Sequence, residues 1–194
     1  MGKFMPIPAF TNLTLGLVGF GRIGRLVAAK SKAFGFHVVA YDPLAPDSCF
    51  AENGVTRVRL EELFQKADII SLHCPMVPET RHLINKKTIA QFKPGVLIVN
   101  TSRGLLINEA DLVAGLTSGK IIGAGLDVFE KEPLAADSPL RALSNVILTS
   151  HAASVSDKAI VLLETKAAEA ARDFLLGKRP ASVIVDVELK GGKG

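Results

Sequence analysis

A glycine-rich turn between an apolar strand and a helix constrains this fold more than any other feature of the sequence. The segment Thr14–Phe20 has the continuously apolar character of a buried β-strand, and Gly19, Gly21 and Gly24 follow with GxGxxG spacing. The segment Arg22–Phe34 then has the pattern of a helix. In such a turn the first glycine allows the tight bend, the second lets the backbone approach a ligand, and the third lets helix and strand pack closely. The N-terminus of the helix offers unpaired N–H groups to an anion such as a phosphate.

The same alternation of strand and helix continues through most of the chain. The short runs rich in Val and Ile are apolar throughout, as expected for a parallel sheet that helices cover on both faces. We therefore expect an α/β fold of the Rossmann type, with a doubly wound parallel sheet and right-handed crossovers. Further strands are predicted at His37–Tyr41, Asp68–His73, Val96–Asn100, Ile121–Asp127 and Val146–Thr149, and further helices at Leu60–Lys66, Lys86–Gln91 and Glu109–Ser118.

The last part of the chain has a different character. One long helix is predicted over Asp157–Leu176, with Ser156 as its N-cap and Gly177 as its C-terminal stop. Its apolar residues extend beyond one face, so the helix is expected to need partners on more than one side. We therefore divide the chain into an N-terminal extension (1–12), a nucleotide-binding domain (13–155), the long helix (156–177) and a tail (178–194).

Composition limits the alternatives. A chain of 194 residues with 48% hydrophobic and 22% charged residues suits one globular domain. The net charge of +4 is spread without a basic run, so no nucleic-acid partner is expected. No apolar run approaches the roughly 20 residues that span a bilayer, and Met1–Phe10 lacks signal-peptide features. Cys49 and Cys74 are too few for a disulfide framework and are not spaced as metal ligands, so free thiols in the cytoplasm and no bound metal are expected.

An acidic residue at the end of the second predicted strand narrows the choice of ligand. Asp42 lies 18 positions after Gly24, where dinucleotide-binding folds place the carboxylate that binds the adenosine ribose. This carboxylate would repel a 2′-phosphate, so the predicted cofactor is NAD rather than NADP. The alternative is that Asp42 and Pro43 only begin a turn. Arg22 and Ile23 would complete the phosphate-binding loop.

Three more motifs follow the glycine loop in the second half of the chain. They span Val99–Gly104, Gly125–Pro133 and Leu148–Ala153. In this order they resemble the NAD-binding domain of the D-isomer-specific 2-hydroxyacid dehydrogenases, a family that includes phosphoglycerate, glycerate and D-lactate dehydrogenases. The resemblance runs from about Leu13 to about Val187. It implies an NAD-dependent oxidoreductase that interconverts D-2-hydroxy acids and 2-oxo acids.

The resemblance places the catalytic residues at Arg103, Glu132 and His151. Reduction of a 2-oxo acid needs a hydride at the carbonyl carbon and a proton at its oxygen. Arg103 could hold the carboxylate and carbonyl oxygens together, and His151 would be the general acid and base. Glu132 would orient the imidazole and favour its protonated form. Each residue alone could be a surface or packing residue, but all three follow buried strands, at the sheet edge where ligands bind in open α/β folds.

The same resemblance implies further contacts with the cofactor, from Cys74, Thr101 and Asp127. Of these, Asp127 would lie at the nicotinamide end. His73, at a strand end, is predicted to be a packing residue rather than a site residue. His37 and His82 are predicted to be surface residues without a role.

Two departures from the family affect the functional prediction. Ser150 stands where the family usually has a proline before the catalytic histidine, so the loop is expected to be held less rigidly. Only 13 residues precede Thr14, so the family's substrate-binding domain is expected to be absent. We therefore expect a chain that binds NAD(H) and turns over poorly alone. The alternative is a non-catalytic NAD(H)-binding module of the corepressor type, and association into a homodimer through the last helix is possible in either case.

Overall fold

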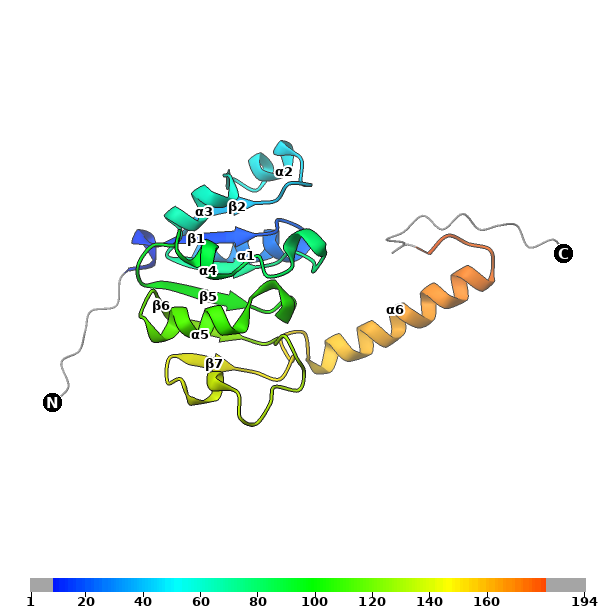
Figure 1. Cartoon of the computed structure of the whole chain (residues 1–194). Coiled ribbons are helices and arrows are strands. Elements are labelled where there is room, and N and C mark those ends of the chain that lie inside the picture. The colour runs from blue at the N-terminus through cyan, green and yellow to red at the C-terminus, as the bar shows by residue number, and fades with distance from the viewer. Residues whose placement is uncertain (1–8, 181–194) are drawn as a thin grey trace. The chain divides into compact units, whose positions relative to one another are not determined.

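Seven parallel strands form one sheet in the order β3-β2-β1-β4-β5-β6-β7 in the computed structural model, which describes residues 9–180 (Figure 1). Chain order runs outward from β1 to β3 and then resumes on the other side of β1 with β4. The carboxyl ends of β1 and β4 therefore form the switch point at which ligands bind in such sheets. The strands are β1 (Thr14–Val18), β2 (His37–Tyr41), β3 (Thr56–Arg57), β4 (Ile69–Leu72), β5 (Val96–Asn100), β6 (Ile121–Leu126) and β7 (Val146–Leu148).

Helices connect these strands and cover the sheet. They are α1 (Arg22–Ala33), α2 (Asp47–Glu52), α3 (Leu60–Lys66), α4 (Lys86–Ile89) and α5 (Glu109–Thr117), with 3-10 turns at Phe10–Asn12, Pro78–Thr80, Gly104–Leu106 and Pro139–Ala142. The predicted doubly wound α/β fold is confirmed, and every predicted strand and helix is present within two residues at each end. The helix α2 and the two-residue strand β3 were not predicted.

Two groups of buried side chains form the core. The smaller group includes Leu17 and Ala40 and lies where α1 packs on β1 and β2. The larger group includes Leu63, Ile70 and Leu112, and it involves α3 and α5. The sheet therefore holds the ends of β1, β4, β5 and β6 in fixed register, and the loops that follow these strands carry the candidate site.

The chain divides into two units, residues 1–153 and 154–194. The second unit contains α6 (Asp157–Leu175). The hydroxyl of Ser156 accepts a hydrogen bond from the Ala159 N–H at 3.0 Å, and Gly177 has a φ of 68°, so both predicted end signals of this helix are present. No residue of α6 is buried. Within residues 9–180 no helix combines the length and apolar character needed to cross a membrane.

Candidate active site

The glycine loop after β1 has the close backbone contacts that its motif requires. Gly19 has a φ of 96°, and a Cβ there would lie 2.6 Å from the backbone nitrogen of Cys74. A Cβ on Gly24 would lie 2.4 Å from the carbonyl oxygen of Gly19. A Cβ on Gly21, in contrast, would meet nothing within 4 Å. The first and third glycines therefore allow packing, and the second leaves open space at the N-terminus of α1, as a pyrophosphate site needs.

Asp42 lies beside this loop at the end of β2. Its Oδ2 atom accepts a hydrogen bond from the Phe20 N–H at 2.8 Å, and its Oδ1 atom accepts from the N–H groups of Leu44 (2.9 Å) and Ala45 (3.3 Å). These bonds fix the carboxylate at the side of a cavity of about 430 Å³. The cavity is lined by Phe20, Gly21, Arg25, Asp42, Leu44, Ala45, Pro46, Ser48, Cys49 and Glu52. Its position next to the loop fits the adenosine end of a dinucleotide, with Arg22 and Ile23 exposed in the first turn of α1.

Arg103 follows β5 in a loop that a buried asparagine holds. The side-chain oxygen of Asn100 accepts a hydrogen bond from the Ser102 N–H at 3.0 Å, and its amide donates to the Arg103 carbonyl at 2.9 Å. The guanidinium of Arg103 is exposed and donates to the Ser102 carbonyl at 2.6 Å. At Gly104 a Cβ would lie 1.8 Å from the Phe129 carbonyl oxygen, so this loop packs directly on the segment after β6.

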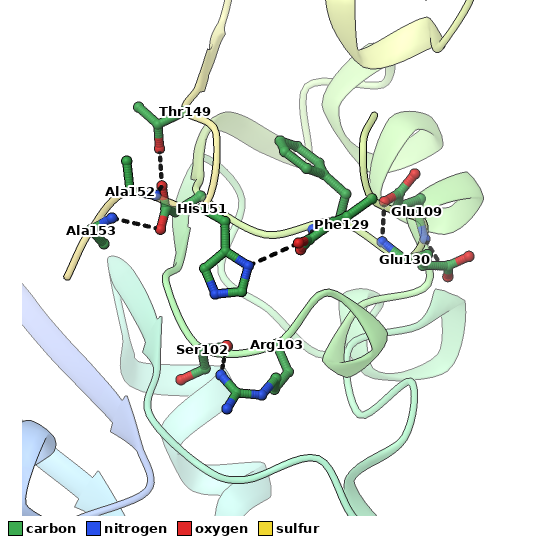
Figure 2. A network of polar contacts seen from close by, with 11 residues as sticks. Ser102, Arg103, Glu109, Phe129, Glu130, Thr149, His151, Ala152 and Ala153 are labelled. Carbon is green, nitrogen blue, oxygen red and sulfur yellow. Dashed lines mark hydrogen bonds and ion pairs between the residues drawn. The ribbon is translucent and has the colours of Figure 1, made fainter. Parts of the chain in front are cut away.

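His151 and Glu132 form the pair that the sequence predicted (Figure 2). The Nδ1 atom of His151 lies 2.8 Å from Oε2 of Glu132, and both side chains are exposed. The other carboxylate oxygen of Glu132 accepts from the Phe129 N–H at 3.1 Å. The hydrogen bond with His151, followed by that from Phe129, lowers the pKa of Glu132 below its usual value. No hydrogen bond to Nε2 of His151 is found within residues 9–180, so this nitrogen can exchange a proton with a ligand.

Asp127 anchors the loop that carries His151. Its buried carboxylate accepts hydrogen bonds from the Thr149 hydroxyl and from the N–H groups of Ala152 and Ala153, both at 2.8 Å. Its carbonyl accepts from the His151 N–H at 2.8 Å. Burial alone would raise the pKa of Asp127, but the three donors outweigh it and hold the pKa low. Sequence reasoning assigned this residue to the nicotinamide end and missed its role in the loop.

A second cavity, of about 790 Å³, opens next to the histidine–glutamate pair. Its lining combines apolar side chains with both members of the pair. The lining residues are Phe129, Glu132, Pro133, Leu134, Arg141, Leu148, Thr149, Ser150, His151 and Ala152. The pair therefore borders a space large enough for a small organic acid.

The other predicted site residues lie near the same sheet edge. Cys74 is partly buried after β4, and this burial raises the pKa of its thiol to about 11. Thr101 is exposed directly after β5. Their contacts with a cofactor stay predictions. His73 is the packing residue that was expected: its Nε2 lies 2.9 Å from the Ser71 hydroxyl, and burial lowers its pKa to about 4.

His82 was predicted to be a surface residue without a role, but its side chain is only 27% exposed and contacts a carboxylate, whereas His37 is exposed as predicted. His82 Nε2 lies 3.0 Å from Oε1 of Glu130, and this nitrogen is buried without a well-aligned hydrogen bond. The backbone N–H groups of Glu109 and Glu130 each donate to the side-chain carboxylate of the other residue. The only sequence signal for this contact was the run of charges around Glu130, which is more typical of a solvated loop.

Known proteins share both the sequence and the fold. A profile described as "D-isomer specific 2-hydroxyacid dehydrogenase, NAD binding domain" matches residues 2–153. A D-3-phosphoglycerate dehydrogenase of Mycobacterium leprae is 45% identical over 89% of this chain and 33% of its own length. A glyoxylate reductase of Korarchaeum cryptofilum is 41% identical over 88% of this chain and 52% of its own length.

A solved structure adds the fold to this likeness. The D-lactate dehydrogenase of Aquifex aeolicus, in complex with NAD and lactic acid, is 34% identical and superposes with a TM-score of 0.81. The match covers 91% of this chain and 57% of that enzyme. The chain thus spans between a third and somewhat more than half of the length of these relatives. Since the family profile matches most of the sequence, the chain belongs to the D-isomer-specific 2-hydroxyacid dehydrogenases, as their NAD-binding domain.

Proposed function

We propose that this chain binds NAD(H) and supplies the proton-transfer and carboxylate-binding groups for the interconversion of a D-2-hydroxy acid and a 2-oxo acid. The observation that carries the proposal is the 2.8 Å contact between His151 and Glu132, beside an open cavity at the carboxyl edge of the sheet. The glycine loop and Asp42, at the other side of the switch point, support NAD as the cofactor.

The chain's own groups account for the proton and for the orientation of the substrate. When bound, NADH supplies a hydride to the carbonyl carbon of the 2-oxo acid. The His151 imidazolium donates its Nε2 proton to the carbonyl oxygen, and in the reverse direction the neutral ring accepts the hydroxyl proton. Glu132 holds the ring at Nδ1 and stabilises its charged form. The exposed guanidinium of Arg103 can bind the substrate carboxylate through two parallel hydrogen bonds.

The named relatives support catalysis rather than the corepressor-type alternative. They are a dehydrogenase that acts on phosphoglycerate, a glyoxylate reductase and a D-lactate dehydrogenase. They share the reaction type but differ in substrate, so the proposal extends to the 2-hydroxy or 2-oxo acid class and not to one member. Since these relatives are longer, we expect this chain alone to bind NADH and to turn over slowly.

Two variants separate the two halves of the site. His151→Ala is expected to lower turnover at least about a hundredfold because it removes the proton donor, and to leave NADH affinity nearly unchanged. Asp42→Ala is expected to weaken NADH binding and to reduce the preference over NADPH. NADH binding is followed by nicotinamide fluorescence, and turnover is followed at 340 nm with a panel of 2-oxo acids. Undiminished turnover in His151→Ala contradicts the catalytic role, and tight NADH binding with no turnover of any 2-oxo acid favours the non-catalytic alternative.

We further propose a cytoplasmic location, the absence of a nucleic-acid partner and association into a homodimer. Free thiols at Cys49 and Cys74 support a reducing compartment such as the cytoplasm. The absence of a basic run in the sequence supports the absence of a nucleic-acid partner. Exposed apolar side chains on α6, such as Leu163 and Phe174, support association into a homodimer. Multi-angle light scattering tests this last point, and a monomer at all concentrations contradicts it.

A further inference from the structure

Three ionisable side chains from distant parts of the sequence meet next to the segment that carries Glu132. The N–H of Glu109 donates to Oε1 of Glu130 at 3.1 Å, and the N–H of Glu130 donates to Oε1 of Glu109 at 2.6 Å (Figure 2). His82 brings its Nε2 atom to 3.0 Å from the same Oε1 atom of Glu130. We call these three residues the carboxylate clasp. All three are only partly exposed, and none has a place in the proton transfer described above.

The clasp joins the segment of His82 to the segment of Arg103. The N–H of His82 donates to the Leu105 carbonyl at 2.8 Å, two residues after Arg103. The N–H of Ile84 donates to the Leu106 carbonyl at 3.0 Å, so the two segments pair over several residues. The backbone of His82 has a φ of 49°, which residues other than glycine rarely adopt. This strained backbone belongs to the residue whose imidazole contacts Glu130.

The clasp also joins this region to the loop of Glu132. Glu130 is two residues before Glu132, and the Phe129 N–H between the clasp and β6 donates to the Glu132 carboxylate. Gly104, next to Arg103, packs so closely on Phe129 that a Cβ would overlap its carbonyl. A displacement of the segment 129–130 would therefore move Arg103 and Glu132 relative to each other.

The electrostatics of the clasp indicate a fixed arrangement. Burial, and then the nearby charge of Glu130, raise the pKa of Glu109 above its usual value. Two carboxylates this close repel each other unless donors offset the repulsion. The two backbone N–H groups are such donors, and Nε2 of His82, although it makes no well-aligned hydrogen bond, lies 3.0 Å from Oε1 of Glu130. Movement of either segment would break these two hydrogen bonds and leave a partly buried carboxylate without its donor, so the segments of Glu109 and Glu130 have little freedom to move independently.

We propose that Glu130, held by His82 and Glu109, is a positioning residue that keeps the segment 129–130 in place and so fixes both Glu132 and Arg103 relative to His151. Its consequence for catalysis rests on the function proposed above, in which Arg103 binds the substrate and His151 protonates it. A small displacement of Arg103 relative to His151 would lower the rate strongly, because hydride and proton transfer both need the substrate carbonyl at a defined place.

The test uses the titration of the Glu132 side chain, followed by carbon NMR in the full chain, so it needs no turnover. In Glu130→Ala the segment 129–130 loses its hold, and we expect the hydrogen bond between Glu132 and His151 to weaken. The pKa of Glu132, which this bond lowers, should then rise toward the usual value of 4.5. The loss of a neighbouring negative charge would by itself lower the pKa of Glu132. The direction of the shift therefore separates a change of position from a change of charge.

Glu130→Gln is the matched control. It removes the same charge but keeps an oxygen that can accept from Glu109 and contact His82, so the pKa of Glu132 should stay low. If Glu130→Ala does not fold, as judged by circular dichroism, Glu109→Ala replaces it, because the N–H of Glu109 still donates to Glu130 in that variant. A pKa of Glu132 that stays low in the folded alanine variant overturns the proposal.

NADH affinity and turnover distinguish this inference from the proposed function. The glycine loop and Asp42 have no contact with the clasp, so NADH should bind Glu130→Ala and the parent chain equally well. In any preparation with measurable turnover, we expect kcat to fall at least about tenfold in Glu130→Ala and to recover in Glu130→Gln. A raised pKa of Glu132 in a chain that never turns over 2-oxo acids would support the clasp and refute the function. An unchanged pKa of Glu132 in a chain that turns over 2-oxo acids would support the function and refute the clasp.

Discussion

Lowering the pH should destabilise this protein through one partly buried histidine. His73 lies after β4, with its Nε2 2.9 Å from the Ser71 hydroxyl, and burial lowers its pKa from 6.5 to about 4. The folded protein therefore keeps the ring neutral at pH values where the unfolded chain already binds a proton. The stability that the neutral ring contributes is complete above about pH 6.5 and is lost as the pH falls. The loss levels off below about pH 4, where the ring is protonated in the folded protein too.

The magnitude follows from the two pKa values. Linkage gives a free-energy loss from His73 of roughly 2 kcal/mol at pH 5 and only about 0.2 kcal/mol at pH 7. These figures are upper values, since the ring is partly accessible to water. A change of about 2 kcal/mol is a large part of the stability of an ordinary domain, which is about 5–15 kcal/mol.

His73→Gln isolates this contribution, because glutamine keeps a polar group near Ser71 but does not titrate. Urea unfolding of the parent chain and the variant is compared at pH 7, 6 and 5. The variant should be less stable at pH 7 because packing is lost, and the difference should shrink by about 2 kcal/mol at pH 5. All other titrating groups are present in both proteins and cancel. His37→Gln, at an exposed position, should follow the parent chain. A difference between His73→Gln and the parent that stays constant from pH 7 to pH 5 refutes the reasoning.

Three further predictions concern stability. Gly104→Ala should lower the free energy of unfolding by more than about 3 kcal/mol or prevent folding, because its Cβ would overlap the Phe129 carbonyl. Gly125→Ala is the control and should change the urea midpoint little, since nothing lies within 4 Å of its Cβ. Asp127→Asn should lower the free energy of unfolding at pH 7 by about 1–3 kcal/mol. This difference from the parent chain should shrink as the pH falls through the lowered pKa of Asp127, because the charged carboxylate supplies it, and a difference independent of pH contradicts this. Phe64→Ala should cost about 3–5 kcal/mol because the ring is fully buried against Phe92, and Leu44→Ala, at a position 91% exposed, should cost less than about 1 kcal/mol; equal losses in calorimetry would exclude the assigned burial.

The sequence was sufficient to predict most of the sheet, because a buried strand can be recognised from the apolar character of its own residues. Strands buried on both faces need apolar side chains at successive positions, so a segment such as Thr14–Val18, in which the last four residues are buried, was recognisable without any partner. The missed elements lack this property. The strand β3 has two residues and both are exposed, and α2 begins directly after Pro46 in a stretch typical of a turn. Neither buries enough apolar surface to leave a periodic pattern.

The candidate site was only partly predictable, for a different reason. The glycine loop, Asp42 and the three residues Arg103, Glu132 and His151 lie within short motifs or directly after strands, so their neighbourhood follows from the topology. The clasp does not, because His82 and Glu130 are 48 positions apart and contact each other through a strained loop. The run of charges around Glu130 is the only trace of this contact in the sequence, and it does not identify His82 as the partner.

The loop of His151 shows how the structure replaces a feature that the family usually supplies. A proline before the histidine would restrict the backbone through its ring, and Ser150 cannot do so. His151 nevertheless has a φ of 56°, a conformation that costs free energy and needs support from its surroundings. The support comes from Asp127, whose carboxylate and carbonyl together accept four hydrogen bonds, from Thr149, His151, Ala152 and Ala153. Because Asp127 directly follows β6, the orientation of the imidazole depends on the sheet and not on residue 150.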